Sequence, residues 1–252
     1  MSLKGRIALV TGGTRGVGRA IALALAEDGA DVAVNYTRNE EAAAATVADL
    51  EKLGRRAIAY RAAVQNYEED ESMVRRILED LGPVSILVNN AGIASRGNSV
   101  ADTDPEELVR VVSIHAFAAH YLSKLLIPAM RTQPRGDIIM ISSSATQGLG
   151  ANGAPYNMGK TAQEALAQTL YKEERENNIR VNVVAPGLVE TEMGRRLVRA
   201  TQGIDDLRKL DASMPFGRVC QPEDVANVVR FLVSERNSYV TGERLYVNGG
   251  SA

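Results

Sequence analysis

Short apolar runs recur along the chain, and longer segments with helical periodicity separate them. The runs are nearly continuous and rich in β-branched residues, which is typical of strands that helices cover on both faces. They predict strands at 6–11, 31–36, 56–62, 84–90, 137–142, 179–185 and 244–249. The segments between them predict helices at 16–28, 40–53, 67–81, 105–131, 155–176 and 222–234.

Strand alternates with helix over the full length. We therefore expect one doubly wound α/β domain spanning 1–252, with a parallel sheet of about seven strands and helices on both faces. The longest irregular segment, 187–214, is typical of a lid over a binding site. Ligands of such sheets bind beyond the carboxyl ends of the strands, where the winding direction changes. Residues that directly follow a strand are thus the candidates for function.

Composition narrows the class of protein. Of the 252 residues 45% are hydrophobic, and the net charge is -2. No run of Lys and Arg resembles a nucleic-acid arm, so we expect neither nucleic acid nor a membrane surface as partner. The longest apolar stretch, 20–26, is too short to span a bilayer. The single cysteine, Cys220, excludes an internal disulfide and suits a cytoplasmic protein, and no metal site is expected.

A glycine-rich loop, "VTGGTRGVGRAIA", joins the first strand to the first helix. Glycines at this position let the backbone turn tightly and approach a pyrophosphate, while the helix N-terminus offers free amides and a positive dipole end. A glycine triplet alone is a weak signal, but its position between strand and helix favours a dinucleotide. The candidate contacts are Gly12, Thr14, Arg15, Gly16, Val17 and Gly18.

The end of the second strand indicates which dinucleotide binds. An acid there would take the ribose hydroxyls of NAD, but this chain has Tyr36, Thr37 and Arg38, with no acid before Glu40. Arg38, together with Arg15 from the glycine loop, could pair with a 2′-phosphate. We therefore predict NADP(H) rather than NAD(H), although Arg38 could instead pair with Glu41 or face water.

Further motifs follow the later strands in order: "NNAG" at 89–92, Ser143, "YNMGK" at 156–160, "APG" with Thr191, and "VTGERLYVNGG" near the end. With "TGGTRGVG" they resemble the classical short-chain dehydrogenase/reductase family over essentially the whole chain. The subgroup that the chain resembles most is the β-ketoacyl-[acyl-carrier-protein] reductase-like carbonyl reductases. The resemblance implies a Rossmann fold and reversible hydride transfer between nicotinamide and a carbonyl.

The resemblance also implies roles for single residues. Tyr156 would give the substrate oxygen a proton, and Ser143 would hold that oxygen, although Ser142 and Ser144 flank it. Lys160 lies one helical turn beyond Tyr156. Its charge and that of the oxidised nicotinamide should lower the pKa of Tyr156. The implied cofactor contacts are Val64, Asn90, Ala91, Gly92, Tyr156, Lys160, Pro186, Gly187, Val189 and Thr191.

Three positions depart from the family pattern. His115 replaces an asparagine of the long fourth helix, whose kink and carbonyl hold a water that links the lysine to solvent. The imidazole could pack there, or it could join the proton relay. Ala63 replaces an adenine-binding aspartate, and Gly159 replaces the serine before the lysine, a change without an evident consequence.

Substrate and assembly are less constrained. The subgroup implies a 3-oxoacyl thioester or related ketone, with a sugar, steroid or small ketone as alternatives and a cofactor-binding regulator as a different class of function. Arg195, Arg196 and Arg199 could meet an acidic substrate, or belong to a solvated amphipathic helix. A basic patch for an acyl-carrier protein would involve Lys124, Arg131 and Arg135. The family implies a homotetramer, or a dimer, that pairs the helices at 105–131 and 155–176.

Overall fold

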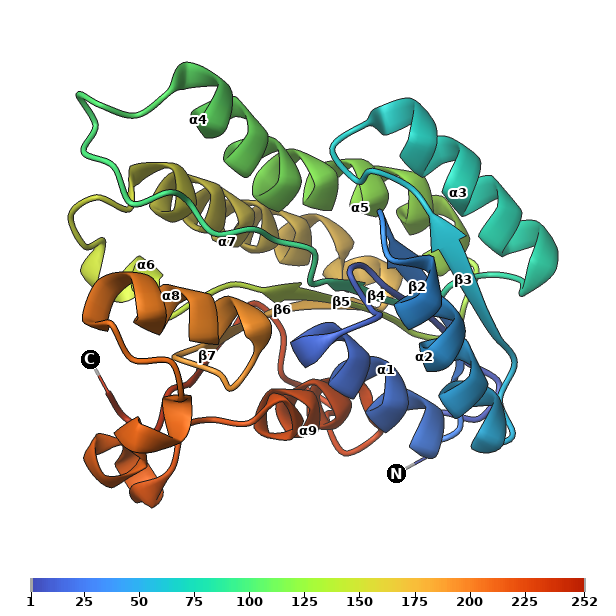
Figure 1. The fold of residues 1–252 in the computed structure, drawn as a ribbon. Coiled ribbons are helices and arrows are strands. Elements are labelled where there is room, and N and C mark those ends of the chain that lie inside the picture. Colours follow the sequence, from blue (N-terminus) through green and yellow to red (C-terminus); the bar gives the residue numbers. More distant parts are fainter. Residues whose placement is uncertain (1, 252) are drawn as a thin grey trace.

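The sheet at the centre of the molecule is fully parallel (Figure 1). The computed structural model describes residues 2–251. The strand order is β3-β2-β1-β4-β5-β6-β7. The bounds are β1 Ile7–Val10, β2 Asp31–Tyr36, β3 Ala57–Arg61, β4 Ile86–Asn89, β5 Gly136–Ile141, β6 Ile179–Pro186 and β7 Arg244–Val247. This arrangement confirms the predicted doubly wound fold, and each strand lies within two residues of its predicted bounds.

Helices cover both faces of the sheet (Figure 1). One layer holds α3 Tyr67–Asp80, α4 Pro105–Val112, the π-helical turn η1 Ser113–Phe117, α5 Ala118–Met130 and α7 Ala154–Glu174. The other layer holds α1 Gly16–Glu27, α2 Glu40–Lys52 and α9 Pro222–Val233. A short turn η2, Arg175–Asn177, follows α7. A separate apolar core lies between the sheet and each layer.

The sequence explains why the strands form where they do. Every residue of β5, "GDIIMI", is buried, as are the middle residues of β2. Helices begin at side chains that accept hydrogen bonds from free amides: Asn39 caps α2, Asn66 caps α3, and Asp104 caps α4 with a proline directly after it. These caps set the connections between sheet and helices.

The long fourth helix of the prediction is one continuous element with a local change of winding. Five residues, Ser113–Phe117, form a π-helical turn between α4 and α5. Among the described residues, 105–130 is the one helix long and apolar enough to cross a membrane. Its buried side chains, such as Val111 and Leu122, pack in the domain, so its apolar character is accounted for by the core.

The segment 187–214 was expected to be irregular, and that expectation is wrong for most of its length. It contains α8 Glu192–Gln202 and the 3-10 turn η3 Leu207–Ser213, and a second turn, η4 Pro215–Gly217, follows. Thr191 caps α8 by accepting a hydrogen bond from the Gly194 amide. This helix matches the alternative interpretation of the charged segment as an amphipathic helix, and its Val198 packs with Leu207 and Val219 in a small separate core.

The winding direction changes between β1 and β4. The chain moves from β1 outward through β2 to β3 and then returns to β4 on the other side of β1. Because the strands are parallel, the segments after their carboxyl ends share one edge of the sheet. The short helix α6, Ala145–Gly148, and α8 also lie at this end (Figure 1).

Candidate active site

The glycine loop after β1 forms a cradle that side chains would fill. Gly12 and Gly16 adopt positive φ angles of 58° and 51°. A Cβ at Gly18 would collide with the carbonyl oxygen of Gly12 and the side chain of Asn90. Helix α1 starts after Arg15 without a side-chain cap and without an acid in its first turn. Its amides and positive dipole end are therefore available to an anion such as a pyrophosphate.

Three polar side chains, which the sequence analysis did not assign to this role, hold the loop. Asn90 donates its side-chain amide to the carbonyl of Thr11 at 2.8 Å. The Thr11 hydroxyl accepts hydrogen bonds from the backbone amides of Asn90 and Ala91, both at 2.9 Å. Buried Asn35 accepts from the Gly12 amide and donates to the carbonyl of Ala62. An asparagine inside the apolar run "DVAVNY" was the available signal.

The predicted selectivity residues lie at the solvent-exposed end of β2. Tyr36 is half-buried, while Thr37 and Arg38 are exposed. Arg38 has no ion-pair partner among residues 2–251, so the alternative pair with Glu41 does not form. Arg15 makes an exposed ion pair with Glu192 at 3.2 Å.

Three other predicted contacts have structural roles. Val64 is 4% exposed and packs in the core beside α3, which leaves little of its side chain for an adenine. Buried Thr14 turns its carbonyl towards the hydroxyl of Thr46, and half-buried Val17 packs on the core beneath α1. The amide of Ala63, at the position of the absent aspartate, donates to Glu69.

Three consecutive serines follow β5, and their contacts distinguish the one that faces Tyr156. Ser142 is buried and donates to Glu164 at 2.5 Å, and the backbone amide of Ser144 donates to the carbonyl of Pro186. Ser143 is the serine that interacts with Tyr156. Burial raises the pKa of Tyr156, and the Ser143 hydroxyl opposes this rise. Lys160 is not among the groups that shift this pKa, so the chain alone does not produce the expected lowering.

Lys160 is buried one turn after Tyr156 on α7. Its ammonium group donates to the carbonyl of Ile141 at 2.7 Å and to Gln163 at 3.4 Å. Burial lowers the pKa of Lys160 to about 8, and the Glu164 carboxylate opposes this shift. The ammonium is therefore present at neutral pH and is lost just above it.

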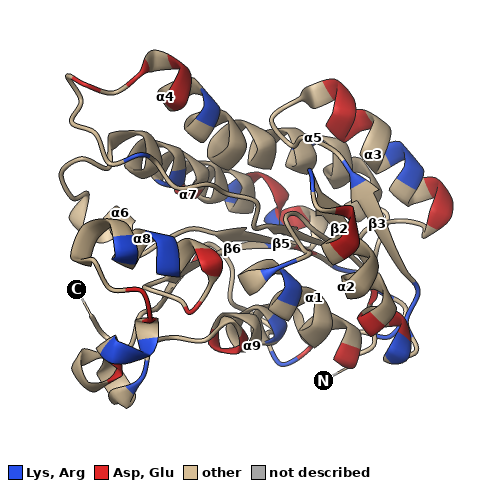
Figure 2. Cartoon of the chain, viewed as in Figure 1, with Lys and Arg blue, Asp and Glu red and all other residues tan. Residues whose placement is uncertain are grey.

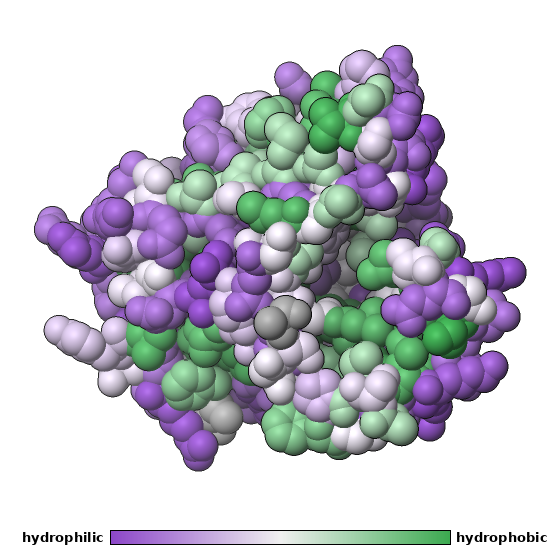
Figure 3. Space-filling model, turned by 90° about the vertical axis from the view of Figure 1, so that its left-hand side faces the viewer, coloured by the Kyte–Doolittle hydropathy of each residue, from purple (hydrophilic) through white to green (hydrophobic). Residues whose placement is uncertain are grey.

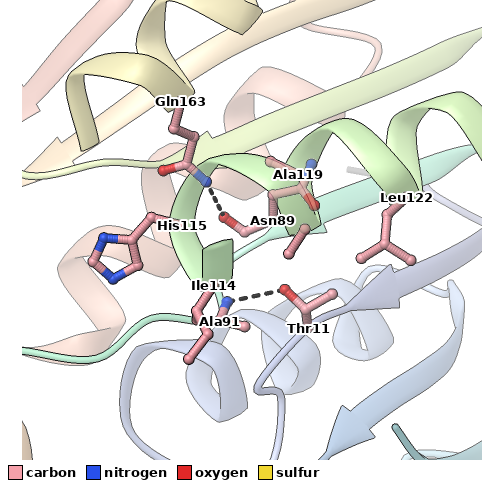
Figure 4. A pocket seen from close by; sticks show the side chains of 9 residues that line it. Thr11, Asn89, Ala91, Ile114, His115, Ala119, Leu122 and Gln163 are labelled. Atoms are coloured by element: carbon pink, nitrogen blue, oxygen red, sulfur yellow. Dashed lines mark hydrogen bonds between the residues drawn. The ribbon is translucent and has the colours of Figure 1, made fainter. Parts of the chain in front are cut away.

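His115 lies in the π-helical turn beside these groups. Its Nε2 accepts a hydrogen bond from the Ile93 amide at 3.0 Å. Burial lowers the pKa of His115 to about 2, and the positive charge of Lys160 acts in the same direction. Figure 4 shows the ring at the edge of a narrow pocket that Ile114, Asn89 and Gln163 also line. This geometry favours a packed, neutral imidazole over a proton carrier.

The loop after β6 closes the site from the other side. A Cβ at Gly16 would lie 3.2 Å from the Thr191 methyl, so the glycine loop and this loop nearly touch. Pro186 ends β6, Gly187 packs against Asn248, and Val189 forms a bridge with Cys220. A Cβ at Gly92 would lie 3.1 Å from His115 Nε2 and 3.6 Å from Lys160 Nζ. The loops after β1, β4 and β6 therefore meet at the carboxyl ends of the strands, in the crevice where a doubly wound sheet binds its ligand, whereas Val64 lies in the core.

Glu164 is a further residue of this region that the sequence analysis did not select. Its carboxylate accepts hydrogen bonds from Ser142 and Thr146, on either side of Ser143, and forms an ion pair with Arg244 at 2.5 Å. It thereby ties the loop after β5 to α7 and to β7. The Lys160-x-x-x-Glu164 spacing places both on one helical face and was its only sequence signal.

Most of the candidate basic residues are paired with acids. Arg131 and Arg135 flank the amino end of β5, which is opposite the site, and pair with Glu174 and Asp137. Lys124 lies over the ring of Tyr67. On α8 each arginine is paired with an acid: Arg195 with Glu190, Arg196 with Glu192 and Arg199 with Asp205. In Figure 2 basic and acidic residues are interspersed along the ribbon.

Two further observations concern thiol chemistry and metal binding. Burial raises the pKa of the Cys220 thiol to about 11, so this cysteine is a poor nucleophile. Within residues 2–251, no cluster of three His, Cys, Asp or Glu side chains could hold a metal ion.

A glycine cradle at the switch point, together with Ser143, half-buried Tyr156 and buried Lys160, defines a dehydrogenase-like site, and comparison with known proteins assigns its family. Residues 12–252 match the model of a family described as enoyl-(acyl carrier protein) reductase. The chain belongs to the short-chain dehydrogenase/reductase family, as the motifs predicted, and is an oxidoreductase acting between alcohol and carbonyl groups.

Individual relatives act on different substrates. The chain is 38% identical over 252 residues to 3-oxoacyl-[acyl-carrier-protein] reductase of Escherichia coli, covering 99% of this chain and 98% of the relative. It is 36% identical to 3alpha-hydroxysteroid dehydrogenase of Mediterraneibacter gnavus, covering 100% and 98%. The structure of L-sorbose reductase from Gluconobacter frateurii with NADPH and L-sorbose superposes with a TM-score of 0.90 at 31% identity, covering 99% and 97%.

Proposed function

We propose that this protein is an NADP(H)-dependent carbonyl reductase that works reversibly as an alcohol dehydrogenase, with a 3-oxoacyl thioester or related ketone as substrate. The observation that carries the proposal is the meeting of Ser143, Tyr156 and Lys160 beside the glycine cradle. A proton donor, an oxygen-binding hydroxyl and a cation are the groups that carbonyl reduction requires.

The residues present fit NADP(H). Gly12, Gly16 and Gly18 leave the space that a pyrophosphate needs at the start of α1. Arg38 is exposed and unpaired within residues 2–251, and Arg15 is held only by an exposed ion pair, so both guanidinium groups can turn to a 2′-phosphate. Thr191 and Gly187, across the crevice, would hold the nicotinamide end. When bound, the reduced cofactor supplies a hydride.

The chain's own residues supply the proton and the orientation. As negative charge develops on the carbonyl oxygen, Tyr156 transfers its phenolic proton to that oxygen, while Ser143 donates a hydrogen bond to it. Burial keeps the pKa of Tyr156 raised, so the phenol is protonated when the substrate arrives. Together with the charge of the oxidised nicotinamide, the Lys160 ammonium would stabilise the phenolate that remains after transfer, an effect that the chain alone does not produce.

The choice of substrate class rests on two points. The chain aligns over nearly its full length with a 3-oxoacyl-[acyl-carrier-protein] reductase. In addition, Met193 and Leu197 of α8 are 43% and 52% exposed, and Leu149 beyond α6 is 55% exposed. Figure 3, which faces the side of α6 and α8, shows apolar patches between polar ones. Apolar side chains beside the site suit an acyl chain better than a sugar.

A second candidate within the same class is a hydroxysteroid dehydrogenase. The same apolar side chains could contact a steroid, and one relative carries that activity in its name. A regulator that only binds the cofactor is disfavoured by Tyr156 and the buried Lys160, because a sensor needs neither a proton donor nor a cation at this position.

One experiment separates these functions. NADPH and NADH oxidation should be followed with a panel that includes acetoacetyl thioesters, an oxosteroid, a ketose and small ketones. We expect NADPH oxidation with the thioester to be fastest. A faster reaction with the oxosteroid would support the second candidate. Binding of NADPH without oxidation by any member of the panel would support a regulator, and preference for NADH would contradict the assignment of Arg15 and Arg38.

Assembly and location stay predictions. A homotetramer should appear in light scattering after size-exclusion chromatography. Val109 of α4 and Phe117 of η1 are 63% and 48% exposed on the helices expected to pair, which supports this prediction. The protein is expected in the cytoplasm, and activity confined to the cytosolic fraction of its source cells would test that.

A further inference from the structure

Helix α7 contains a glycine between its two key residues. Gly159 lies three residues after Tyr156 and directly before Lys160. Glycine weakens a helix interior relative to alanine, so its presence here calls for a reason. A Cβ at this position would lie 2.9 Å from Nδ1 and 3.0 Å from Cβ of His115. His115 is 1% exposed, so its ring has little room to move away. Gly159 and His115 are therefore matched to each other.

The ring of His115 uses the space that Gly159 leaves to contact two parts of the site. Its Nε2 accepts the hydrogen bond from Ile93 in the loop after β4. Its face-to-edge contact with the ring of Tyr156 has a centroid distance of 5.1 Å and an interplanar angle of 89°. This is the geometry that attractive aromatic pairs adopt. One imidazole thus joins η1, the loop after β4 and α7.

The protonation state of His115 limits what it can do. Because Nε2 accepts a hydrogen bond, the proton of the neutral ring lies on Nδ1. Nδ1 is buried and has no hydrogen-bond partner among the described residues. The Lys160 ammonium lies near the same point, since a Cβ at Gly92 would be 3.6 Å from its Nζ, and its charge opposes a second positive charge on the imidazole. Neither nitrogen is placed to pass a proton to Tyr156.

We propose that His115 is a positioning residue that fixes the Tyr156 ring for proton transfer, and that Gly159 is present to admit the imidazole. The proposal rests on the proposed function only for the role of Tyr156. Proton transfer depends steeply on geometry, and shifts well below 1 Å matter. A ring held on one side by His115 and at its hydroxyl by Ser143 has little freedom to turn.

A double-mutant cycle tests the match between the two residues. Gly159→Ala should lower Tm in the wild-type background because the new methyl meets the ring. In the His115→Ala background the same change should lower Tm much less, because the ring atoms are gone and only the 3.0 Å contact with Cβ remains. Gly148→Ala, a helical glycine whose Cβ would meet nothing within 4 Å, is the control and should shift Tm equally in both backgrounds. Equal shifts for Gly159→Ala would overturn the proposal.

Kinetics test the positioning role. His115→Asn should lower kcat by roughly tenfold and leave KM for NADPH within about twofold, because the cofactor cradle is untouched. His115→Phe keeps a ring against Tyr156 but has no ring nitrogen, and should stay within about fivefold of the wild-type kcat. Equal losses in both variants would show that a nitrogen is needed and would overturn positioning. An unchanged kcat in His115→Asn would show a purely structural role and would also overturn it.

One readout does not depend on activity. The Tyr156 phenol can be titrated by ultraviolet absorbance as the difference between a protein and its Tyr156→Phe variant. In His115→Asn the titration midpoint of Tyr156 should fall towards that of a free tyrosine, because the ring that helps to bury it is gone. An unchanged midpoint would overturn the proposal, whereas failure of the proposed function would appear as inactivity of the wild-type protein with a normal Tm cycle.

Discussion

The two ends of the cofactor crevice are built differently. At the catalytic end Lys160, His115 and Glu164 are each at most 6% exposed, and each contacts neighbouring elements. At the end of β2, Arg38 is exposed and the Arg15 side chain is 76% exposed, with one ion pair to Glu192. The buried end is fixed by packing, so a change there should affect many contacts. The exposed end depends on charge alone.

This difference suggests a division of tasks. Hydride and proton transfer need fixed geometry, which packing supplies. Selection between NADP(H) and NAD(H) needs only the presence or absence of charge near the ribose, and flexible exposed guanidinium groups can supply that. We therefore expect substitutions at the catalytic end to lower kcat, and substitutions at the β2 end to change KM for the cofactor.

The largest effect is expected for Tyr156→Phe, which removes the proton donor and keeps the ring that His115 contacts. The turnover number should fall by roughly 10³-fold, the size expected for a general acid, while NADPH binding measured by fluorescence should change little. The matched control is Tyr239→Phe, which removes a phenol that is 96% exposed. Turnover at the wild-type rate in Tyr156→Phe would rule out the proposed chemistry.

The next largest effect tests the exposed end. Arg15→Ala combined with Arg38→Ala should raise KM for NADPH by roughly 30-fold, since each charge-assisted bond from an exposed side chain to a phosphate is worth about 1 kcal/mol. KM for NADH should change by less than about threefold. Arg236→Ala, another exposed arginine without a partner in residues 2–251, is the control. Equal losses for both cofactors would mean that these arginines do not read the 2′-phosphate.

A tenfold effect is expected from pH at the buried end. The pKa of Lys160 is lowered to about 8, so its ammonium is present below that pH and is lost as pH rises through it. The pKa of Tyr156 is raised, so the phenol keeps its proton over the same range. The rate of carbonyl reduction at saturating substrate should therefore fall about tenfold from pH 7 to pH 9. A flat profile would place the pKa of Lys160 elsewhere in the complex.

The accuracy with which the sequence predicted the elements and the site residues also differs between regions of the molecule. The strands were predictable because buried apolar runs such as "DIIMIS" have no other stable environment. The site residues could be named because each directly follows a strand or shares a helical face. The helix α8 was predicted only as an alternative to an irregular lid, because its alternating charges also suit a loop, and the Thr191 cap and the burial of Val198 decide for the helix.

Contacts between distant segments were beyond the sequence. Gly159 had no evident consequence until the ring of His115, 44 positions earlier, was found against it. The role of Asn35 depends on a glycine loop that precedes it by more than twenty residues. The raised pKa of Tyr156 follows from burial, which helical spacing to Lys160 does not report. Each of these depends on packing in three dimensions, which residue spacing leaves open.

The smallest predicted effect tests the difference between the two ends of the crevice most directly, because it concerns a single exposed ion pair. Glu192 holds Arg15 across the mouth of the crevice and also pairs with Arg196. Glu192→Gln frees Arg15 for the 2′-phosphate, and since exposed ion pairs are worth at most about 1 kcal/mol, KM for NADPH should fall by roughly two- to fivefold. In the Arg15→Ala background the same change should have no effect. Asp205→Asn, which frees Arg199 on the same helix, is the matched control. If Glu192→Gln lowers kcat instead, the ion pair belongs to the end of the crevice that packing fixes. The boundary between the two ends would then lie closer to the cofactor phosphates than the exposure of Arg15 indicates.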